Sequence, residues 1–136
     1  MDWKECGKNK LEKEIKVDKS LVSSLLKTSA NKLKTQEMIK LDDTTSVSKI
    51  SLMYDALREI LEALSVSKGY KIYNHECYVS FLKEILKESR FGDRFDNFRK
   101  IRNAVNYYGK EISAKEAESV LKEMEEFIDL LKKKFF

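Results

Sequence analysis

Apolar residues recur every three or four positions along most of this chain, which is the spacing of one face of an α-helix. The pattern is clearest between residues 47 and 64, where one apolar stripe consists of Val47, Ile50, Tyr54, Leu57, Leu61 and Leu64. A second apolar side of the same segment carries Met53, Ala56, Ile60 and Ala63. A helix that is apolar on two sides contacts several neighbours, so we expect this helix to lie at the centre of the fold.

The same periodicity predicts five helices joined by short connectors, at residues 18–41, 47–68, 74–88, 93–109 and 113–134. Asp18 can cap the first of these helices, and Ser113 with Glu116 forms a capping box at the start of the last. Three glycines fall where the periodicity breaks, at Gly69, Gly92 and Gly109. We expect each of them to end a helix.

The N-terminal segment 1–17 is too sparsely apolar to predict a helix. We expect it to form a lead-in arm that Trp3 anchors to the body of the protein. Residues 18–136 then form a single helical-bundle domain, long enough to bury a core without disulfides or metals. The chain has no proline and only four glycines, which favours long helices and makes strands scarce, so the predicted class is all-α.

Composition and charge exclude several kinds of protein but leave the ligand open. Cys6 and Cys77 are not in a CxxC pattern and have little histidine nearby, so we expect two reduced thiols, no metal site and an intracellular location. No run approaches the about 18 apolar residues of a membrane span, and the N-terminus has no apolar signal core, which predicts a cytoplasmic protein without a membrane partner. The net charge of +4 arises in residues 1–40, which hold ten lysines and six acidic residues. Such an excess permits contact with nucleic acid but does not imply it, because solubility alone explains it.

Segment 94–109 is the most informative for function, because it combines an apolar helix face with clustered basic and amide side chains. Guanidinium groups three residues apart can hold a phosphate bidentately, and neighbouring amides can bind a sugar or a base. Tyrosines at the end of the helix can stack on a base or donate to a phosphate. The predicted RNA- or nucleotide-binding residues are Arg99, Arg102, Asn103, Asn106, Tyr107 and Tyr108.

Each of these features also has a purely structural interpretation. Arg102 borders the apolar face, so its stem can cover the core edge while its head pairs with a glutamate. Tyrosines at a helix end commonly pack with the hydroxyl at the surface. His75, the only histidine, is followed by Glu76 and Cys77, but a metal site on a helix needs partners three or four residues apart, so we expect a hydrogen bond at the helix start. Glycine-rich phosphate loops, HExxH and paired CxxC motifs are absent, which argues against classical nucleotide hydrolysis and zinc chemistry.

Five short motifs of the chain carry a family resemblance: Tyr54-Asp55-Ala56-Leu57-Arg58-Glu59, Gly69-Tyr70-Lys71, Asn74-His75-Glu76, Ile101-Arg102-Asn103 and Tyr107-Tyr108-Gly109. Together with the helix order over roughly residues 19–134, they resemble the HEPN domain superfamily, particularly its small stand-alone prokaryotic members. The resemblance implies a four- to five-helix up-and-down bundle. It also implies a homodimer that brings two copies of the fourth-helix motif together across a cleft.

Catalytic members of this superfamily are metal-independent ribonucleases, whose motif is an arginine, a polar residue, a short spacer and a histidine. Arg102 and Asn103 match the start of that motif, whereas Tyr107 or Tyr108 stands where the histidine is expected. A phenol with a pKa near about 10 is a poor general base at neutral pH. We therefore predict a HEPN-like RNA- or nucleotide-binding module that does not cleave and needs no cofactor.

Two alternatives remain open. The first is an active, metal-independent ribonuclease toxin with Arg102, Asn103 and Tyr107 as its catalytic set, paired with a nucleotidyltransferase antitoxin as the resemblance allows. The second is a dimeric protein-interaction module without a nucleic-acid ligand, in which Arg102 is an ion-pair residue.

Overall fold

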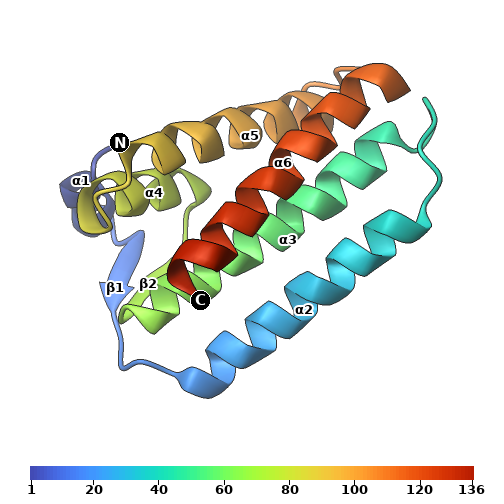
Figure 1. Ribbon diagram of the computed structural model, residues 1–136. Coiled ribbons are helices and arrows are strands. Elements are labelled where there is room, and N and C mark those ends of the chain that lie inside the picture. Colours follow the sequence, from blue (N-terminus) through green and yellow to red (C-terminus); the bar gives the residue numbers. More distant parts are fainter.

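Four long helices make up most of the computed structural model, which describes residues 1–136 (Figure 1). They are α2 (Lys19–Met38), α3 (Ser46–Ser67), α5 (Ser89–Tyr107) and α6 (Ala114–Phe135). The shorter elements are α1 (Trp3–Lys8), β1 (Glu12–Glu14), β2 (Tyr70–Ile72) and α4 (His75–Ser80), which continues into the π-helical turn η1 (Phe81–Ile85). The mostly helical architecture confirms the predicted all-α class, with one small two-stranded sheet added. None of the helices combines the length and apolar character that crossing a membrane requires.

Helix α3 lies at the centre of the fold, as its two apolar sides predicted. It packs against α2, α5 and α6, and Figure 1 shows it between α2 and α6. Ile50, Leu57, Leu61 and Leu64 are all 0% exposed. Burial of each such side chain contributes about 1.5–3 kcal/mol, so this stripe dominates the core.

Helix α2 packs mainly on α3 and is held there partly by buried polar contacts. The carboxylate of Glu59 on α3 is buried and pairs with Lys32 of α2. The buried ammonium of Lys49 donates to the carbonyl oxygens of Gln36 (2.5 Å) and Ile39 (2.6 Å) at the C-terminal end of α2. The carbonyl of Gln36 also accepts from the backbone N–H of Ile39 (3.2 Å), so the lysine adds a second donor there and caps the C-terminal end of α2 from α3.

Most of the predicted helix ends are confirmed. The carboxylate of Asp18 accepts a hydrogen bond from the backbone N–H of Leu21 (3.0 Å). The hydroxyl of Ser113 accepts one from the backbone N–H of Glu116 (3.2 Å). Gly69 follows α3 with a φ of 87°, a conformation that glycine adopts readily.

The prediction that Gly92 ends a helix was wrong. Helix α5 begins at Ser89 and runs through Gly92, while the chain turns earlier, at Lys87, with a φ of 58°. A Cβ atom at Gly92 would lie 2.5 Å from Cγ of Lys83, so the glycine allows η1 and α5 to approach closely. Sequence spacing does not separate a glycine of this kind from a helix stop.

The N-terminal segment forms two elements that its apolar pattern did not predict, α1 and β1. Strand β1 pairs antiparallel with β2, with Glu12 opposite Ile72. Trp3 anchors the segment as expected, because its ring lies 5.4 Å from that of Tyr70 and 5.9 Å from that of Phe81. The segment is therefore packed onto the α4 side of the protein.

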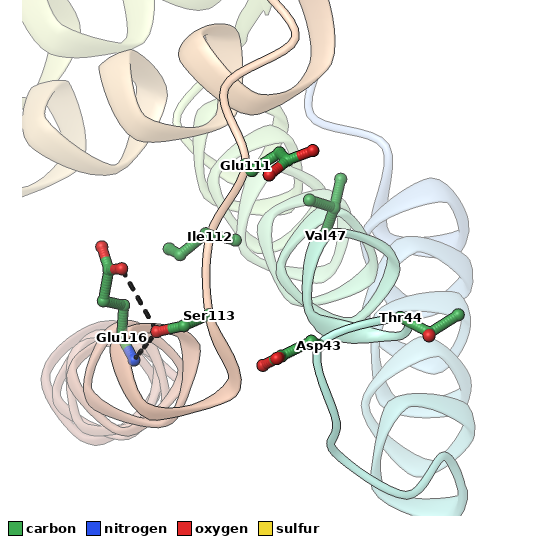
Figure 2. Close-up of a pocket in the computed structure, with 7 residues that line it drawn as sticks. All are labelled: Asp43, Thr44, Val47, Glu111, Ile112, Ser113 and Glu116. Atoms are coloured by element: carbon green, nitrogen blue, oxygen red, sulfur yellow. Dashed lines mark hydrogen bonds between the residues drawn. The ribbon is translucent and has the colours of Figure 1, made fainter.

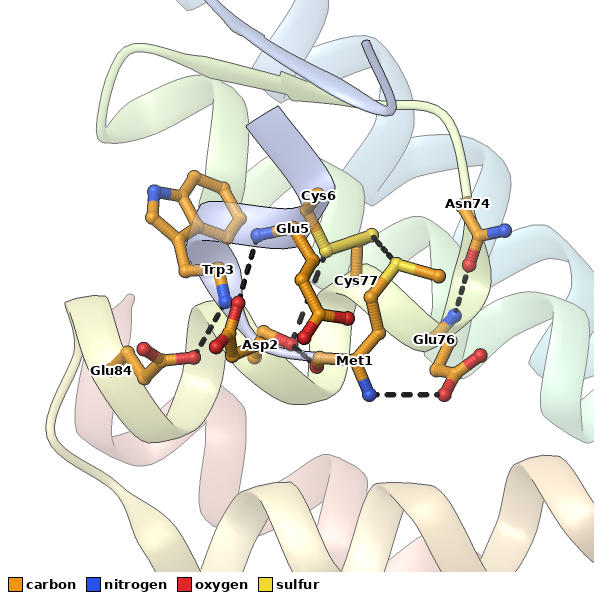
Figure 3. Close-up of a disulfide and its surroundings, with 10 residues drawn as sticks. Met1, Asp2, Trp3, Glu5, Cys6, Asn74, Glu76, Cys77 and Glu84 are labelled. Carbon is orange, nitrogen blue, oxygen red and sulfur yellow. Dashed lines mark hydrogen bonds and ion pairs between the residues drawn. A yellow bond between two sulfur atoms is a disulfide. The ribbon is translucent and has the colours of Figure 1, made fainter. Parts of the chain in front are cut away.

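A disulfide joins α1 to α4 through Cys6 and Cys77 (Figure 3). The expectation of two reduced thiols was therefore wrong, and the intracellular location that it supported no longer follows from the cysteines. The two residues are 71 positions apart, and only the packing of α1 against α4 brings them together. Their spacing in the sequence therefore does not predict this contact.

Candidate functional site

An open cavity of about 480 Å³ lies where the start of α4 faces the second half of α5. We call it the Arg102 cavity. Its lining consists of Tyr73, Asn74, His75, Glu76, Arg99, Arg102, Asn103 and Tyr107. Four of the predicted binding residues thus meet at one site, and a second segment, residues 73–76, joins them.

Arg102 lines this cavity and lies close to two aromatic rings. Its Cζ atom lies 5.3 Å from the ring centroid of Tyr54 and 5.1 Å from that of Tyr107. One terminal nitrogen donates a hydrogen bond to the Tyr107 hydroxyl (2.9 Å), whereas Nε is buried without any partner. Arg102 forms no ion pair with a carboxylate of its own chain, so its interpretation as the partner of a glutamate within the chain does not hold.

Arg99 differs from Arg102 because its charge is already neutralised. Its Nε and one terminal nitrogen both donate to the same oxygen of Asp96, at 3.0 and 2.7 Å, and Lys100 pairs with the other oxygen (3.1 Å). Partial burial raises the pKa of Asp96, but the hydrogen bonds from Arg99 and Lys100 outweigh it and the pKa of this carboxyl is lowered. Asp96 therefore stays ionised and holds Arg99 at the rim of the cavity.

His75 brings a titratable group to the cavity. Its Nδ1 atom lies 3.0 Å from the hydroxyl of Tyr54, which comes from α3. Burial, and then the positive charges of Arg58 and Arg102, lower the pKa of His75. Burial also raises the pKa of Tyr54, so at neutral pH the imidazole is neutral and the phenol keeps its proton.

The helix-start hydrogen bond expected of His75 is made by its neighbour. The side chain of Asn74 accepts from the backbone N–H of Glu76 (2.8 Å) and so caps α4. The imidazole of His75 therefore does not cap α4 and instead contacts the hydroxyl of Tyr54.

Two of the predicted binding residues do not line the Arg102 cavity. The side-chain oxygen of Asn106 accepts a hydrogen bond from the Ser51 hydroxyl (3.0 Å), which ties it to α3. Tyr108 follows the last residue of α5 and is 83% exposed. Helical spacing placed both near Arg102, but the packing of α5 on α3 decides which edge opens into the cavity.

A second cavity, at the N-terminal ends of α3 and α6, has a structural explanation (Figure 2). It contains several acidic side chains, two of which are engaged in helix capping. Asp43 accepts from the backbone N–H of Ala114 (2.8 Å), and Glu116 accepts from the Ser113 hydroxyl (3.2 Å). These contacts fix the connection between α5 and α6 against α3.

Comparisons with protein-family models, with curated proteins and with solved structures gave no match for this chain.

Proposed function

We propose that this protein is an RNA- or nucleotide-binding module in which the guanidinium of Arg102 contacts a phosphate group. The observation that carries the proposal is the unpaired charge of Arg102, which is half-buried, lines the cavity and has no carboxylate partner within the chain. A half-buried charge without a counter-charge is costly, and an anion beside the terminal nitrogens of the guanidinium lowers that cost. Phosphate suits the site because guanidinium binds it through two parallel N–H bonds.

The side chains around Arg102 favour a nucleotide unit as the ligand over an inorganic anion. The side chain of Asn103 forms no hydrogen bond within the chain, so its amide is available to a sugar or a base. Neutral His75 and the hydroxyl of Tyr107 add further polar atoms around the same cavity.

Fluorescence anisotropy with a labelled, unstructured single-stranded RNA tests this proposal. Arg102→Ala is compared with Arg90→Ala, because Arg90 lies on the same helix, is exposed and forms no ion pair. Both variants lose one positive charge, so long-range attraction falls equally in both. We expect Arg102→Ala to weaken binding at least about tenfold, since hydrogen bonds to charged groups contribute about 1.5–3 kcal/mol.

Equal losses in the two variants would contradict the proposal, because they would indicate attraction by net charge alone. Thermal unfolding of both variants checks that each is folded. Competition with an unlabelled mononucleotide distinguishes the two sources of the phosphate. If a mononucleotide displaces the RNA at similar concentration, the mononucleotide itself is the ligand. If it fails to compete, the ligand is the RNA polymer.

We also propose that the helices form a HEPN-like up-and-down bundle that assembles as a homodimer. The order of the long helices and the place of Arg102 and Asn103 late in α5 support this relation. Light scattering during gel filtration measures the assembly directly, and a monomer at every concentration would contradict the homodimer. Co-purification with a nucleotidyltransferase would extend the proposal to a toxin–antitoxin pair.

A second candidate function is metal-independent RNA cleavage, and the position of His75 favours it. The motif position that lacks a histidine holds Tyr107, but His75 lines the same cavity as Arg102 from another helix. Its lowered pKa leaves the imidazole neutral and able to accept a proton. For this role Nδ1 must carry the hydrogen and donate it to the Tyr54 oxygen, which leaves Nε2 free as the base.

A denaturing-gel time course in EDTA tests the second candidate. The wild type is incubated with a labelled structured RNA beside Arg102→Ala and His75→Gln. Cleavage by the wild type and by neither variant supports the ribonuclease. Intact RNA in all lanes would contradict the ribonuclease and keep the binding module as the proposed function. Cleavage that persists in His75→Gln would show that His75 is not the base.

A further inference from the structure

The rim of the Arg102 cavity carries exposed tyrosine rings. Tyr73 is 53% exposed and Tyr107 is 67% exposed, and both line the cavity. Tyr108, the third exposed tyrosine of the chain, follows directly after Tyr107. The other three tyrosines are buried or half-buried, so every exposed tyrosine lies at or beside this one site.

Both rim tyrosines are held by ordered parts of the fold. The hydroxyl of Tyr107 accepts a hydrogen bond from Arg102, whose guanidinium lies against one face of the ring. Tyr73 directly follows β2, and its backbone N–H donates to the carbonyl oxygen of Leu11 (2.8 Å). Its side chain forms no hydrogen bond with the rest of the protein. The backbone of Tyr73 is fixed while its ring faces solvent, which lowers the entropy cost of binding a flat partner.

Aromatic rings beside an unpaired arginine are the features by which proteins bind unpaired bases. Each base has a π-face that stacks on an aromatic ring, and the adjacent phosphate is held by a cation. In a duplex the bases are already stacked on one another, and their faces are not available to such rings. A bare phosphate site, in turn, has no use for two exposed tyrosines on its rim.

From this arrangement we infer that the ligand is a single-stranded segment of RNA, one unpaired base of which stacks on Tyr73 while its phosphate meets Arg102. Tyr107 offers a second stacking surface on its outward face. This inference rests on the proposed function, because it assumes that Arg102 contacts a phosphate. It adds that the RNA is single-stranded and that Tyr73 is the residue that favours single strands over duplexes.

The test measures anisotropy with one unstructured RNA, used single-stranded and annealed to its complement. The variants are Tyr73→Ala, Tyr73→Phe and the control Phe136→Ala, which removes an exposed aromatic ring at the far end of α6. Single strands should bind the wild type more tightly than the duplex. Tyr73→Ala should weaken single-strand binding between about 5-fold and about 150-fold, the range that corresponds to about 1–3 kcal/mol for base–aromatic stacking, while Tyr73→Phe and Phe136→Ala stay within about twofold of the wild type.

Other outcomes overturn the inference in distinguishable ways. If Arg102→Ala abolishes binding and Tyr73→Ala binds as the wild type does, stacking on Tyr73 is wrong and the phosphate site stands. If the duplex binds as tightly as the single strand, selection for unpaired bases is wrong. If no RNA binds the wild type, the proposed function fails as well. If Tyr73→Ala binds RNA normally but no longer assembles, as gel filtration would reveal, the rim tyrosines belong to an interface between protein chains.

Discussion

Reduction of the Cys6–Cys77 disulfide should lower the stability of the protein substantially. The bond joins residues 71 positions apart, so it closes more than half of the chain into a loop in the unfolded state. The chain-entropy relation gives about 3 kcal/mol for a loop of about 15 residues and about 4.7 kcal/mol for about 100, hence about 4 kcal/mol here. The free energy of unfolding of typical domains is about 5–15 kcal/mol, so reduction of the disulfide removes a large share of the stability.

Urea unfolding followed by far-UV circular dichroism measures this effect. The oxidised protein is compared with the reduced protein and with the double variant Cys6→Ala/Cys77→Ala. With a denaturant dependence of about 1–3 kcal/mol per M, the midpoint of the reduced protein should fall by about 1–4 M. The double variant should unfold near the reduced protein and should not respond to reductant.

Two results would refute this reasoning. Equal midpoints for the oxidised and reduced protein would mean that the bond does not restrict the unfolded chain. Two free thiols titrated in the denatured protein without reductant would mean that the bond is not formed. The consequence for the site is direct, because Cys77 lies two residues after His75 and the disulfide holds the first turns of α4 against α1.

Two further predictions concern buried polar groups. Because the pKa of His75 is lowered in the folded protein, the imidazole of the unfolded chain binds a proton at higher pH than that of the folded chain. The free energy of unfolding should therefore fall as the pH drops below about 6.5. His75→Gln should remove that part of the pH dependence. Urea unfolding at about pH 8 and about pH 5 checks this, and an unchanged pH dependence in the variant would contradict it. Lys49→Met should destabilise the protein by about 1–3 kcal/mol, because the carbonyl of Ile39 loses its donor and that of Gln36 keeps only the backbone N–H of Ile39. Exposed Lys40→Met is the matched control, and similar urea midpoints for the two variants would exclude capping by Lys49.

Much of the helical structure could be predicted because its signals are local. The spacing of apolar residues in α3 identified its central position, and Asp18, Gly69 and Ser113 marked helix ends through their own side chains or backbone. Gly92 shows the limit of such signals. Its role depends on Lys83 crossing it from another element, and the residue type alone does not report that contact.

The candidate site was predictable only where its residues share one helix. Arg99, Arg102 and Asn103 lie within five positions on α5, so helical spacing alone places them on neighbouring edges. Asn106 lies on the same strip by spacing, but it stays exposed and its side chain bonds to Ser51 of α3 instead of lining the cavity. The place of Tyr73 on the rim had no signal in the sequence.

The sequence by itself determined the class of fold, the helix boundaries set by caps, and one cationic helix edge, because each of these depends on residues a few positions apart. The tertiary structure alone decided that Tyr54 binds His75 across 21 positions, that His75 faces Arg102, and that Cys6 bonds Cys77. Periodicity reveals which face of a helix is apolar, but it does not reveal which other element covers that face. Contacts between distant segments are therefore fixed only when the helices pack.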